Sequence, residues 1–382
     1  MQELQHSIFP PRAMAEVDLA SRSVRRKAIS PDLYRRLLGG RGINARILYG
    51  LSRQTTNFLG SDTILVLGAG LLTGTPAPRA ARVHLVGISS QSGPLAGTML
   101  PSHFGAEMRF SGYDHLVIRG TSDSPVYVLI HDGEVEFRDA SPFQGADASE
   151  TLLGIREELD DEDVRMICIG GEGESLSGDA EAATGLKGGG RFPAAAALME
   201  AQNLKAVAAR GTLPLEIYDA EKALSSLKIV MDLLCDRKTD GNDFLRDDLY
   251  ERASVMFHRE CLAAAADSLG IDSALLGSDN DMPQPYLELI RAVTGFEFSQ
   301  KEILQVGERI VTLEKLSGLA EAPVRAMPAD SPAAAFPYSP GPEATRSYLE
   351  AYNRVRGWSS DGHPLQETLM RLGLNPESMD PL

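Results

Sequence analysis

Cysteine is scarce in this chain of 382 residues, and that scarcity excludes several kinds of site. The three cysteines are Cys168, Cys235 and Cys261, and no two of them form a C-x-x-C pair. A disulfide framework uses an even set of cysteines, and structural zinc and iron–sulfur sites commonly use four thiolates. This chain alone supplies neither kind of site, and we expect its thiols to be buried.

Long apolar runs are also missing. No stretch of about 18 apolar residues occurs, so we expect no membrane-spanning helix. Met1 to Pro11 lacks the charged region and apolar run of a secretory signal. We therefore expect a cytoplasmic protein.

Positive charge is in short supply. The chain has 37 Lys and Arg against 53 Asp and Glu, which gives a formal net charge of −16 at pH 7. A field of this sign repels phosphate backbones and anionic lipids. We therefore expect neither nucleic acid nor a membrane surface as a partner.

The motifs of several enzyme classes are absent as well. The chain has no G-x-x-x-x-G-K-[ST] stretch, no G-x-S-x-G and no H-x-x-x-H pair, which leaves P-loop, serine hydrolase and zinc hydrolase chemistry unsupported. The turn at 170–174 lacks G-x-G-x-x-G spacing, and its two glutamates would repel a pyrophosphate. The aspartates of 236–248 do not match a calcium loop, and we interpret them as a solvated acidic face.

What the sequence does contain is mixed α and β structure up to Gly211, followed by longer helical periodicities. Asp132-Gly133 predicts a hairpin turn of type I′, and Ser30-Pro31 predicts the start of a helix. The segments do not alternate as regular βαβ units, which predicts an α+β fold. We predict a base domain over 1–211 and a mainly helical domain over 212–382. The expected strands are a hairpin at 15–28 and single strands at 63–67, 82–88, 126–131, 134–138, 164–169 and 204–210. The expected helices are 30–38, one beginning near 43, 149–159, 194–202, 219–235, 245–269, 285–294, 299–316 and 343–356. A linker is expected at 320–342.

Two turns combine glycine with arginine. Gly39-Gly40-Arg41-Gly42 leads directly into a helix, and Gly188-Gly189-Gly190-Arg191 precedes another. Free backbone N–H groups, a helix dipole and a guanidinium together suit a phosphate or another planar anion. A tight packing corner explains such a turn equally well, because glycine is the default residue for unusual backbone geometry.

Several short motifs, taken in order, resemble the tungsten-pterin aldehyde ferredoxin oxidoreductase family. No single motif is specific, but their order extends along nearly the whole chain. The matching pieces are Leu38 to Gly42, Leu72 to Pro78, Phe104-Gly105, Gly112 to Asp114, Pro125 to Tyr127, Asn203 to Val207, Arg210-Gly211, Asp267 to Asp272, Ala292 to Gly295, Gly307 to Ile310 and Arg356 to Trp358.

The resemblance implies a tungsten or molybdenum bis-pyranopterin on the base domain, closed over by the helical part. Arginines and helix-start amides would hold phosphate groups, and aspartates would accept hydrogen bonds from pterin ring N–H groups. The positions it assigns to the cofactor are Gly40, Arg41, Gly42, Arg82, Gly190, Arg191, Asp267, Gly270 and Asp272. It identifies no catalytic residue and no protein metal ligand in this chain.

The chain also departs from that family. Members carry C-x-x-C-x-x-x-C and a distant cysteine for an iron–sulfur cluster, whereas this chain lacks the triplet and has Asp272 at the distant position. We therefore predict that the [4Fe-4S] cluster is absent. The chain is also shorter than usual members, with the middle domain reduced to 219–257.

Two functions stay open on the sequence. The first is a shortened aldehyde oxidoreductase that passes electrons to an external acceptor such as ferredoxin or a companion subunit. The second is a non-catalytic paralogue that keeps the scaffold for partner binding or cofactor handling. Either could form an oligomer.

Overall fold

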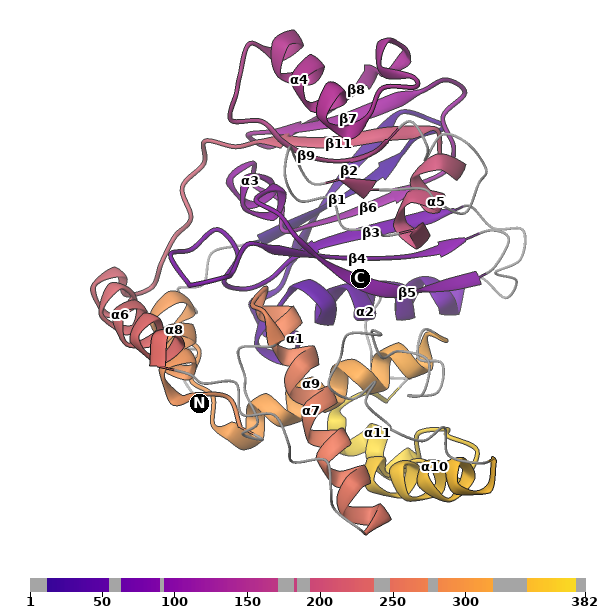
Figure 1. Ribbon diagram of the computed structural model, residues 1–382, viewed down its shortest axis with the longest axis vertical. Helices are drawn as coiled ribbons and strands as arrows, with labels where there is room; N and C mark the ends of the chain where they lie inside the picture. The colour runs from indigo at the N-terminus through magenta and orange to yellow at the C-terminus, as the bar shows by residue number, and fades with distance from the viewer. Residues whose placement is uncertain are drawn as a thin grey trace, which may run out of the picture.

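Two β-sheets, stacked one above the other, form the first half of the chain (Figure 1). The computed structural model describes residues 12–54, 63–89, 93–170, 182–183, 193–236, 248–273, 281–318 and 342–375. The expected turns at 170–174 and 188–191, the acidic segment 236–248 and the linker 320–342 therefore lie wholly or largely outside the described residues.

The first sheet has the strand order β2-β1-β6-β3-β4-β5. All neighbouring strands in it are antiparallel except β1 and β6, which are parallel. Its strands are β1 (Arg12–Asp18), β2 (Ser23–Ile29), β3 (Ile64–Ala69), β4 (Arg82–Ser89), β5 (Gly93–Pro101) and β6 (His115–Arg119).

The second sheet has the order β10-β9-β11-β7-β8, with β11 and β7 parallel and the other pairs antiparallel. Its strands are β7 (Val126–His131), β8 (Glu134–Asp139), β9 (Arg165–Ile169), β10 (Ala182–Ala183) and β11 (Leu204–Arg210). Asp132 and Gly133 join β7 to β8 with φ of 38° and 93°, which confirms the predicted hairpin turn. The mixed sheets confirm the α+β class.

Alternation along the strands gives each sheet two buried faces. In β3, Leu65 and Leu67 face the core between the two sheets, whereas Val66 faces the helical half. In β7, Val128 faces the core between the sheets and Leu129 the layer covered by α4 (Ala148–Leu159). The order of layers is thus α4, second sheet, first sheet and helices, as seen from top to bottom in Figure 1.

Helices make up the rest. Ser30 caps the first of them through its side chain, which accepts a hydrogen bond from the N–H of Leu33, and Pro31 begins it as predicted. The described part of the first half also contains α1 (Pro31–Leu37), α2 (Gly40–Gln54), α3 (Phe104–Phe110) and α5 (Pro193–Ala201), and that of the second half contains α6 (Ala220–Asp236), α7 (Leu249–Leu269), α8 (Gln284–Thr294), α9 (Gln300–Leu316), α10 (Pro342–Arg356) and α11 (Gln366–Leu372).

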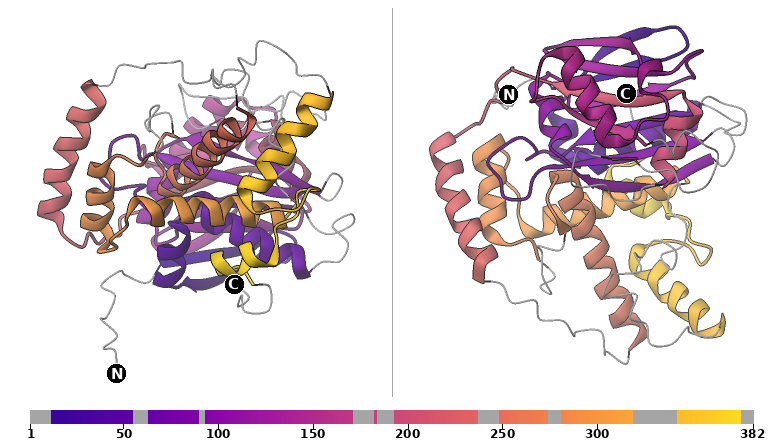
Figure 2. Two further views of the ribbon diagram at one scale, coloured as in Figure 1. Left: turned by 90° about the horizontal axis from the view of Figure 1, so that it is seen from below. Right: turned by 45° about the horizontal axis from the view of Figure 1, so that its top comes forward.

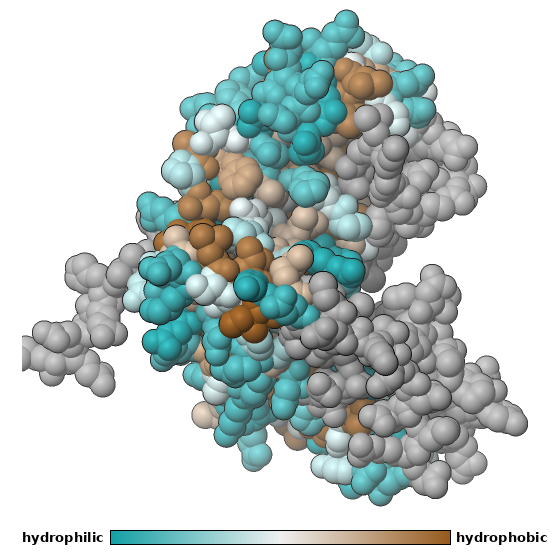
Figure 3. Space-filling view, turned by 60° about the vertical axis from the view of Figure 1, so that its left-hand side comes forward, coloured by the Kyte–Doolittle hydropathy of each residue, from teal (hydrophilic) through white to brown (hydrophobic). Residues whose placement is uncertain are grey.

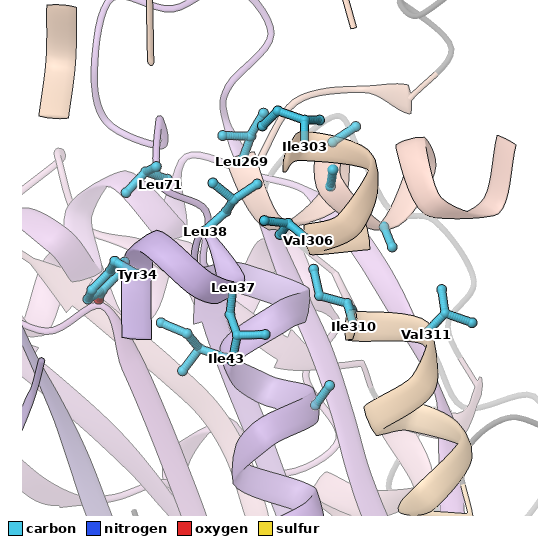
Figure 4. Packing of buried hydrophobic residues seen from close by; sticks show 14 of the residues in the cluster. Tyr34, Leu37, Leu38, Ile43, Leu71, Leu269, Ile303, Val306, Ile310 and Val311 are labelled. Carbon is cyan, nitrogen blue, oxygen red and sulfur yellow. The ribbon is translucent and has the colours of Figure 1, made fainter. Parts of the chain in front are cut away.

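One large apolar core joins the helical half to the first sheet. Figure 4 shows Leu37, Leu38 and Ile43 beside the turn between α1 and α2, packed against Val306 and Ile310 of α9. This core fixes the start of α2 relative to α9. Two cysteines, Cys168 and Cys261, are buried as expected, while the side chain of Cys235 lies outside the described part of the chain.

Candidate functional site

Helix α2 begins at Gly40, earlier than the expected start near residue 43, so the glycines Gly40 and Gly42 lie in its first turn, which packs against the last turn of α7. A Cβ at Gly40 would come within 2.8 Å of the carbonyl oxygen of Asp267, and a Cβ at Gly42 within 2.2 Å of that of Leu37. The amide of Gly42 also donates to the Ser268 hydroxyl at 2.9 Å. These glycines are therefore required because the chain's own backbone approaches them closely.

The loop between β3 and β4 meets α7 in the same way. The amides of Leu71 and Leu72 donate to the carbonyls of Ser268 and Leu269 at 3.0 and 2.9 Å. Gly270 ends α7 in the left-handed conformation, with φ of 83°, and a Cβ at Gly70 would lie 2.1 Å from its nitrogen. Three segments far apart in sequence thus converge on the end of α7.

Arg41 stands at the centre of this junction. Its Nε and one terminal nitrogen donate to the two carboxylate oxygens of Glu314 at 2.7 and 2.8 Å. Its other terminal nitrogen donates to Asp267 at 2.9 Å. Such a bidentate pair has a fixed geometry, so the guanidinium ties the start of α2 to both α7 and α9.

Burial and charge act against each other in this cluster. Burial favours the neutral form of Arg41, but the carboxylates of Glu314 and Asp267 outweigh it and raise the pKa of the guanidinium. For Asp267, burial outweighs the attraction of Arg41 and raises the pKa of the carboxyl, and Glu314 adds to the effect. Two carboxylates thus share one guanidinium.

Arg82 and Asp272 form the second ion pair of the junction. A terminal nitrogen of Arg82 donates to Asp272 at 2.6 Å, and the two side chains are 24% and 21% exposed. The Thr73 hydroxyl holds the backbone here, since it accepts from the Gly70 amide at 3.1 Å and donates to the Arg82 carbonyl at 3.2 Å. Arg82 also lies close enough to Asp267 to lower that carboxyl's pKa, against the larger effect of burial.

The structure therefore brings together seven of the nine sequence-predicted positions: Gly40, Arg41, Gly42, Arg82, Asp267, Gly270 and Asp272. The other two, Gly190 and Arg191, lie outside the described residues. Sequence reasoning missed Glu314, and it included Ser268 only as part of the Asp267 to Asp272 motif. Glu314 lies 273 positions from Arg41, and no local motif marks it.

Of the two arginines in this junction, Arg82 is the one whose N–H groups suit a pterin cofactor. One terminal nitrogen of Arg82 donates to Asp272, and the side chain remains partly exposed, so its other N–H groups suit a phosphate. Each of the three nitrogens of the Arg41 guanidinium already donates to a carboxylate, so a phosphate there would have to share the guanidinium with Glu314 and Asp267. The described residues also contain no group of three His, Cys, Asp or Glu side chains placed to hold a metal ion.

The structure joins a two-sheet part to a helical part through arginine–carboxylate pairs, whereas the sequence motifs had assigned these arginines and aspartates to a cofactor and not to one another. Comparison with known proteins gives the family. The model of the aldehyde ferredoxin oxidoreductase N-terminal domain matches residues 14–211, and that of domains 2 and 3 of the same family matches 204–374. The chain belongs to the aldehyde ferredoxin oxidoreductase family, which confirms the resemblance.

Its curated relatives are considerably longer. The tungsten-containing aldehyde ferredoxin oxidoreductase of Pyrococcus furiosus is 34% identical over 212 residues, which are 54% of this chain and 34% of that protein. The aliphatic sulfonate oxidoreductase WOR-like subunit of the same organism is 33% identical over 225 residues, or 55% and 36%. The chain thus spans about a third of the length of these relatives.

A solved structure shares the fold. It is a chain of the active site complex BamBC of benzoyl coenzyme A reductase with 1,5-dienoyl-CoA, with a TM-score of 0.76 and 18% identity over 95% of this chain and 96% of that chain. At this identity the likeness shows the fold alone. Within the described ranges, none of the helices has the length and apolar character needed to cross a membrane.

Proposed function

We propose that this chain holds a tungsten or molybdenum bis-pyranopterin and oxidises an aldehyde to a carboxylic acid, with water supplying the added oxygen, two protons released and two electrons passed to an external acceptor. Bound at the junction, the cofactor would supply the two-electron redox centre. Membership of the family supports the proposal, and the observation that carries it is the partly exposed Arg82–Asp272 pair beside Asp267. We place this chemistry in the cytoplasm.

Each residue of the junction has a distinct part in this proposal. Arg82 donates to a phosphate oxygen, and Asp272 accepts from a pterin ring N–H. Arg41 keeps Asp267 in place, and Gly40, Gly42 and Gly270 let the three segments meet. We propose Gly190 and Arg191, which fall within the predicted base domain of 1–211, as further cofactor contacts.

The electrons need a route out of the chain. With three cysteines and no C-x-x-C pair, the chain alone cannot ligate a [4Fe-4S] cluster, which we propose is absent. We therefore propose a companion subunit or a ferredoxin as the immediate acceptor. Relatives described as a subunit and as part of a complex support this choice.

Metal analysis of the full chain purified from its native host tests the proposal. We expect one tungsten or molybdenum atom per chain in the wild type. In Arg82→Ala we expect the metal content per chain to fall about tenfold or more, because a charge-assisted contact to the cofactor is removed. Arg119→Ala is the matched control, because Arg119 is 33% exposed and pairs with Glu16 away from the junction. Folded wild-type protein without either metal would refute the proposal, and iron at cluster stoichiometry would contradict the cysteine argument.

The second candidate is a non-catalytic paralogue that keeps the scaffold for partner binding or cofactor handling. The charges of the junction favour it, because Arg41 and Arg82 together face three carboxylates, Asp267, Asp272 and Glu314. A net negative cluster attracts a phosphate poorly. Folded, metal-free protein that still binds a companion subunit is the result expected from this candidate.

A further inference from the structure

Strand β4 presents two polar side chains to the helical half of the chain. Val83 and Leu85 lie in the core between the two sheets, so Arg82 and His84 lie on the opposite face of the strand. Helix α2 packs on β3 and β4 at this face, and Figure 2 (left) shows it beside α9 in front of the first sheet. His84 therefore follows Arg82 along the face on which Arg82 meets Asp272.

Asn44 of α2 fixes the protonation of the His84 ring. Its amide nitrogen donates to the His84 carbonyl oxygen and contacts the ring Nδ1, both at 3.0 Å. Because a carbonyl oxygen can only accept hydrogen bonds, the Asn44 atom beside it is the nitrogen, and Nδ1 must also accept. Burial, with the nearby charges of Arg41 and His115, holds the pKa of His84 well below its usual range, so the ring is neutral at pH 7. A neutral ring with an accepting Nδ1 carries its proton on Nε2.

The Nε2–H group of His84 has no acceptor within the described part of the chain. The residue is only 4% exposed, and the hydrogen bonds of its ring there involve Nδ1 alone. Nε2 points at Gly97 of β5, where a Cβ would lie 2.4 Å from it. The φ of Gly97 is not positive, so the backbone does not require glycine at this position, and the missing side chain leaves space beside the donor. A buried donor without an acceptor is costly, which favours an acceptor on a bound ligand.

Strand β5 leaves this point accessible. It is an edge strand of the first sheet, and Gly97 is exposed. Between the pairs Leu85–Thr98 and Gly87–Leu95, β5 has one residue more than β4, a bulge that includes Gly97. Bulges at sheet edges often redirect side chains beside binding sites. Among the described helices, none packs on β5 as α2 packs on β3 and β4.

We infer that His84 is a second phosphate-binding residue beside Arg82, and that its Nε2–H donates to an oxygen of the phosphate group bound at the junction. Residues two positions apart on a strand are about 7 Å apart, and hydrogen bonds of about 2.8 Å on either side of a phosphate cover that distance. Arg82 supplies the charge, and His84 supplies a neutral donor of fixed direction. The inference deepens the proposed function and rests on it for the source of the phosphate, which is the pterin cofactor.

Metal analysis of full-length variants separates hydrogen-bond donation from a structural role. His84→Leu removes the donor, and we expect the metal content per chain to fall about tenfold, because a hydrogen bond to a charged group is lost. His84→Gln also disturbs Asn44 but keeps an N–H group near the position of Nε2, and it should retain most of the metal. His115→Gln is the matched control: His115 contacts the same Asn44, but its own Nε2 is fully buried, so the metal content should stay unchanged.

A methyl group at position 97 tests the direction of the donor. Gly97→Ala should cover Nε2–H and lower the metal content as His84→Leu does, although His84 itself is intact. Gly145→Ala, where a Cβ would meet nothing within 4 Å, should not lower it. Circular dichroism should show all variants folded. Wild-type metal content in Gly97→Ala would overturn the inference.

Inorganic pyrophosphate separates a failure of this inference from a failure of the proposed function. If the folded wild type contains no metal, the proposed function fails, but the chain should still bind pyrophosphate in calorimetry, about tenfold more weakly in His84→Leu than in His84→Gln. Hydrophilic side chains cover much of the surface shown in Figure 3, and an anion can bind loosely to such a surface. Arg25→Ala controls for this, because Arg25 is exposed on β2, the other edge of the first sheet, and the affinity should not change.

The comparison of the two His84 variants decides the inference in either case. Metal content, or pyrophosphate affinity in metal-free protein, that falls equally in His84→Leu and His84→Gln would show a structural role only. A value that neither variant changes, or metal-free wild type that binds no pyrophosphate, would likewise refute the assignment of His84 to a phosphate.

Discussion

Gly270 and Gly145 have similar backbone conformations but different surroundings. Their φ values are 83° and 74°, yet a Cβ at Gly270 would lie 2.2 Å from the Thr73 hydroxyl, whereas one at Gly145 would meet nothing within 4 Å. Gly145→Ala should therefore lower the free energy of unfolding by about 1 kcal/mol, from the left-handed backbone alone. Gly270→Ala should lower it by about 2–4 kcal/mol, since crowding is added.

Urea unfolding of the two variants measures this difference directly. Equal losses would show that the junction at Thr73 relaxes to make room for a side chain. Because the Thr73 hydroxyl also holds the Arg82 backbone, Gly270→Ala should reduce bound metal as well, if the cofactor is bound there. Gly145→Ala should leave metal content unchanged.

The limits of sequence reasoning at the level of single residues are clear at Arg41. Its place in a turn at a helix start was visible, but both an anion site and a packing corner were open interpretations. The structure shows close backbone packing around the turn and two carboxylates on the guanidinium. Glu314 could not be foreseen, because only the folded chain brings α9 to the start of α2.

At the level of elements, Arg41 connects α2, α7 and α9. Arg41→Met should leave Asp267 and Glu314 as partly buried carboxylates without their hydrogen-bonded counter-charge, and we expect a loss of about 3 kcal/mol in the free energy of unfolding. Arg35→Met is the control, because Arg35 and Glu302 are 45% and 48% exposed, and such a pair contributes about 1 kcal/mol or less.

Unfolding in denaturant compares the two variants, and a double change completes the test. Glu314→Met added to Arg41→Met should recover part of the loss, because it removes one of the stranded charges. If Arg41→Met is no worse than Arg35→Met, then apolar packing alone holds the three helices together.

The elements that sequence reasoning found and missed differ in how much they depend on tertiary context. The hairpin of β7 and β8 and the long helices α7 and α9 carry local signals: turn residues, caps and periodicity. By contrast, β5 contains two glycines and two prolines and reads as a loop. It forms a strand because it lies at the sheet edge, where proline is tolerated. Helices α3 and α11 have only seven residues each, too few for a periodic pattern.

At the scale of the whole molecule, a buried polar network joins α2 to the first sheet. Asn44 of α2 donates to His84 Nδ1 at 3.0 Å and accepts from His115 Nδ1 at 2.8 Å. His115 Nε2 is buried with no hydrogen-bond partner among the described residues. A proton added there would have no acceptor, so the network requires neutral imidazoles.

Acidification should therefore loosen the contact between α2 and the first sheet. Burial, with the nearby charge of Arg41, holds the pKa of His84 well below its usual range, and burial chiefly lowers that of His115 to about 4, with Asp114 opposing the shift. The unfolded chain binds protons at these sites near pH 6.5, before the folded chain does. The free energy of unfolding should thus fall as pH drops from 6.5 toward 4, by up to about 3 kcal/mol from His115 alone.

Chemical unfolding at a series of pH values, with His115→Gln compared with His363→Gln, isolates this effect. His363 is 78% exposed, so its replacement should leave the pH dependence unchanged, whereas His115→Gln should flatten the slope between pH 6.5 and 4. The Asp114 carboxylate acts in a different pH window. The pKa of Asp114 is lowered because Arg109 and Arg12 outweigh burial. Its contribution to the free energy of unfolding is therefore lost only below pH 3.8. The raised pKa of Asp267 acts on the free energy of unfolding in the opposite sense. An unchanged slope in His115→Gln would mean that water reaches the network and that α2 is joined to the first sheet less tightly than the buried contacts indicate.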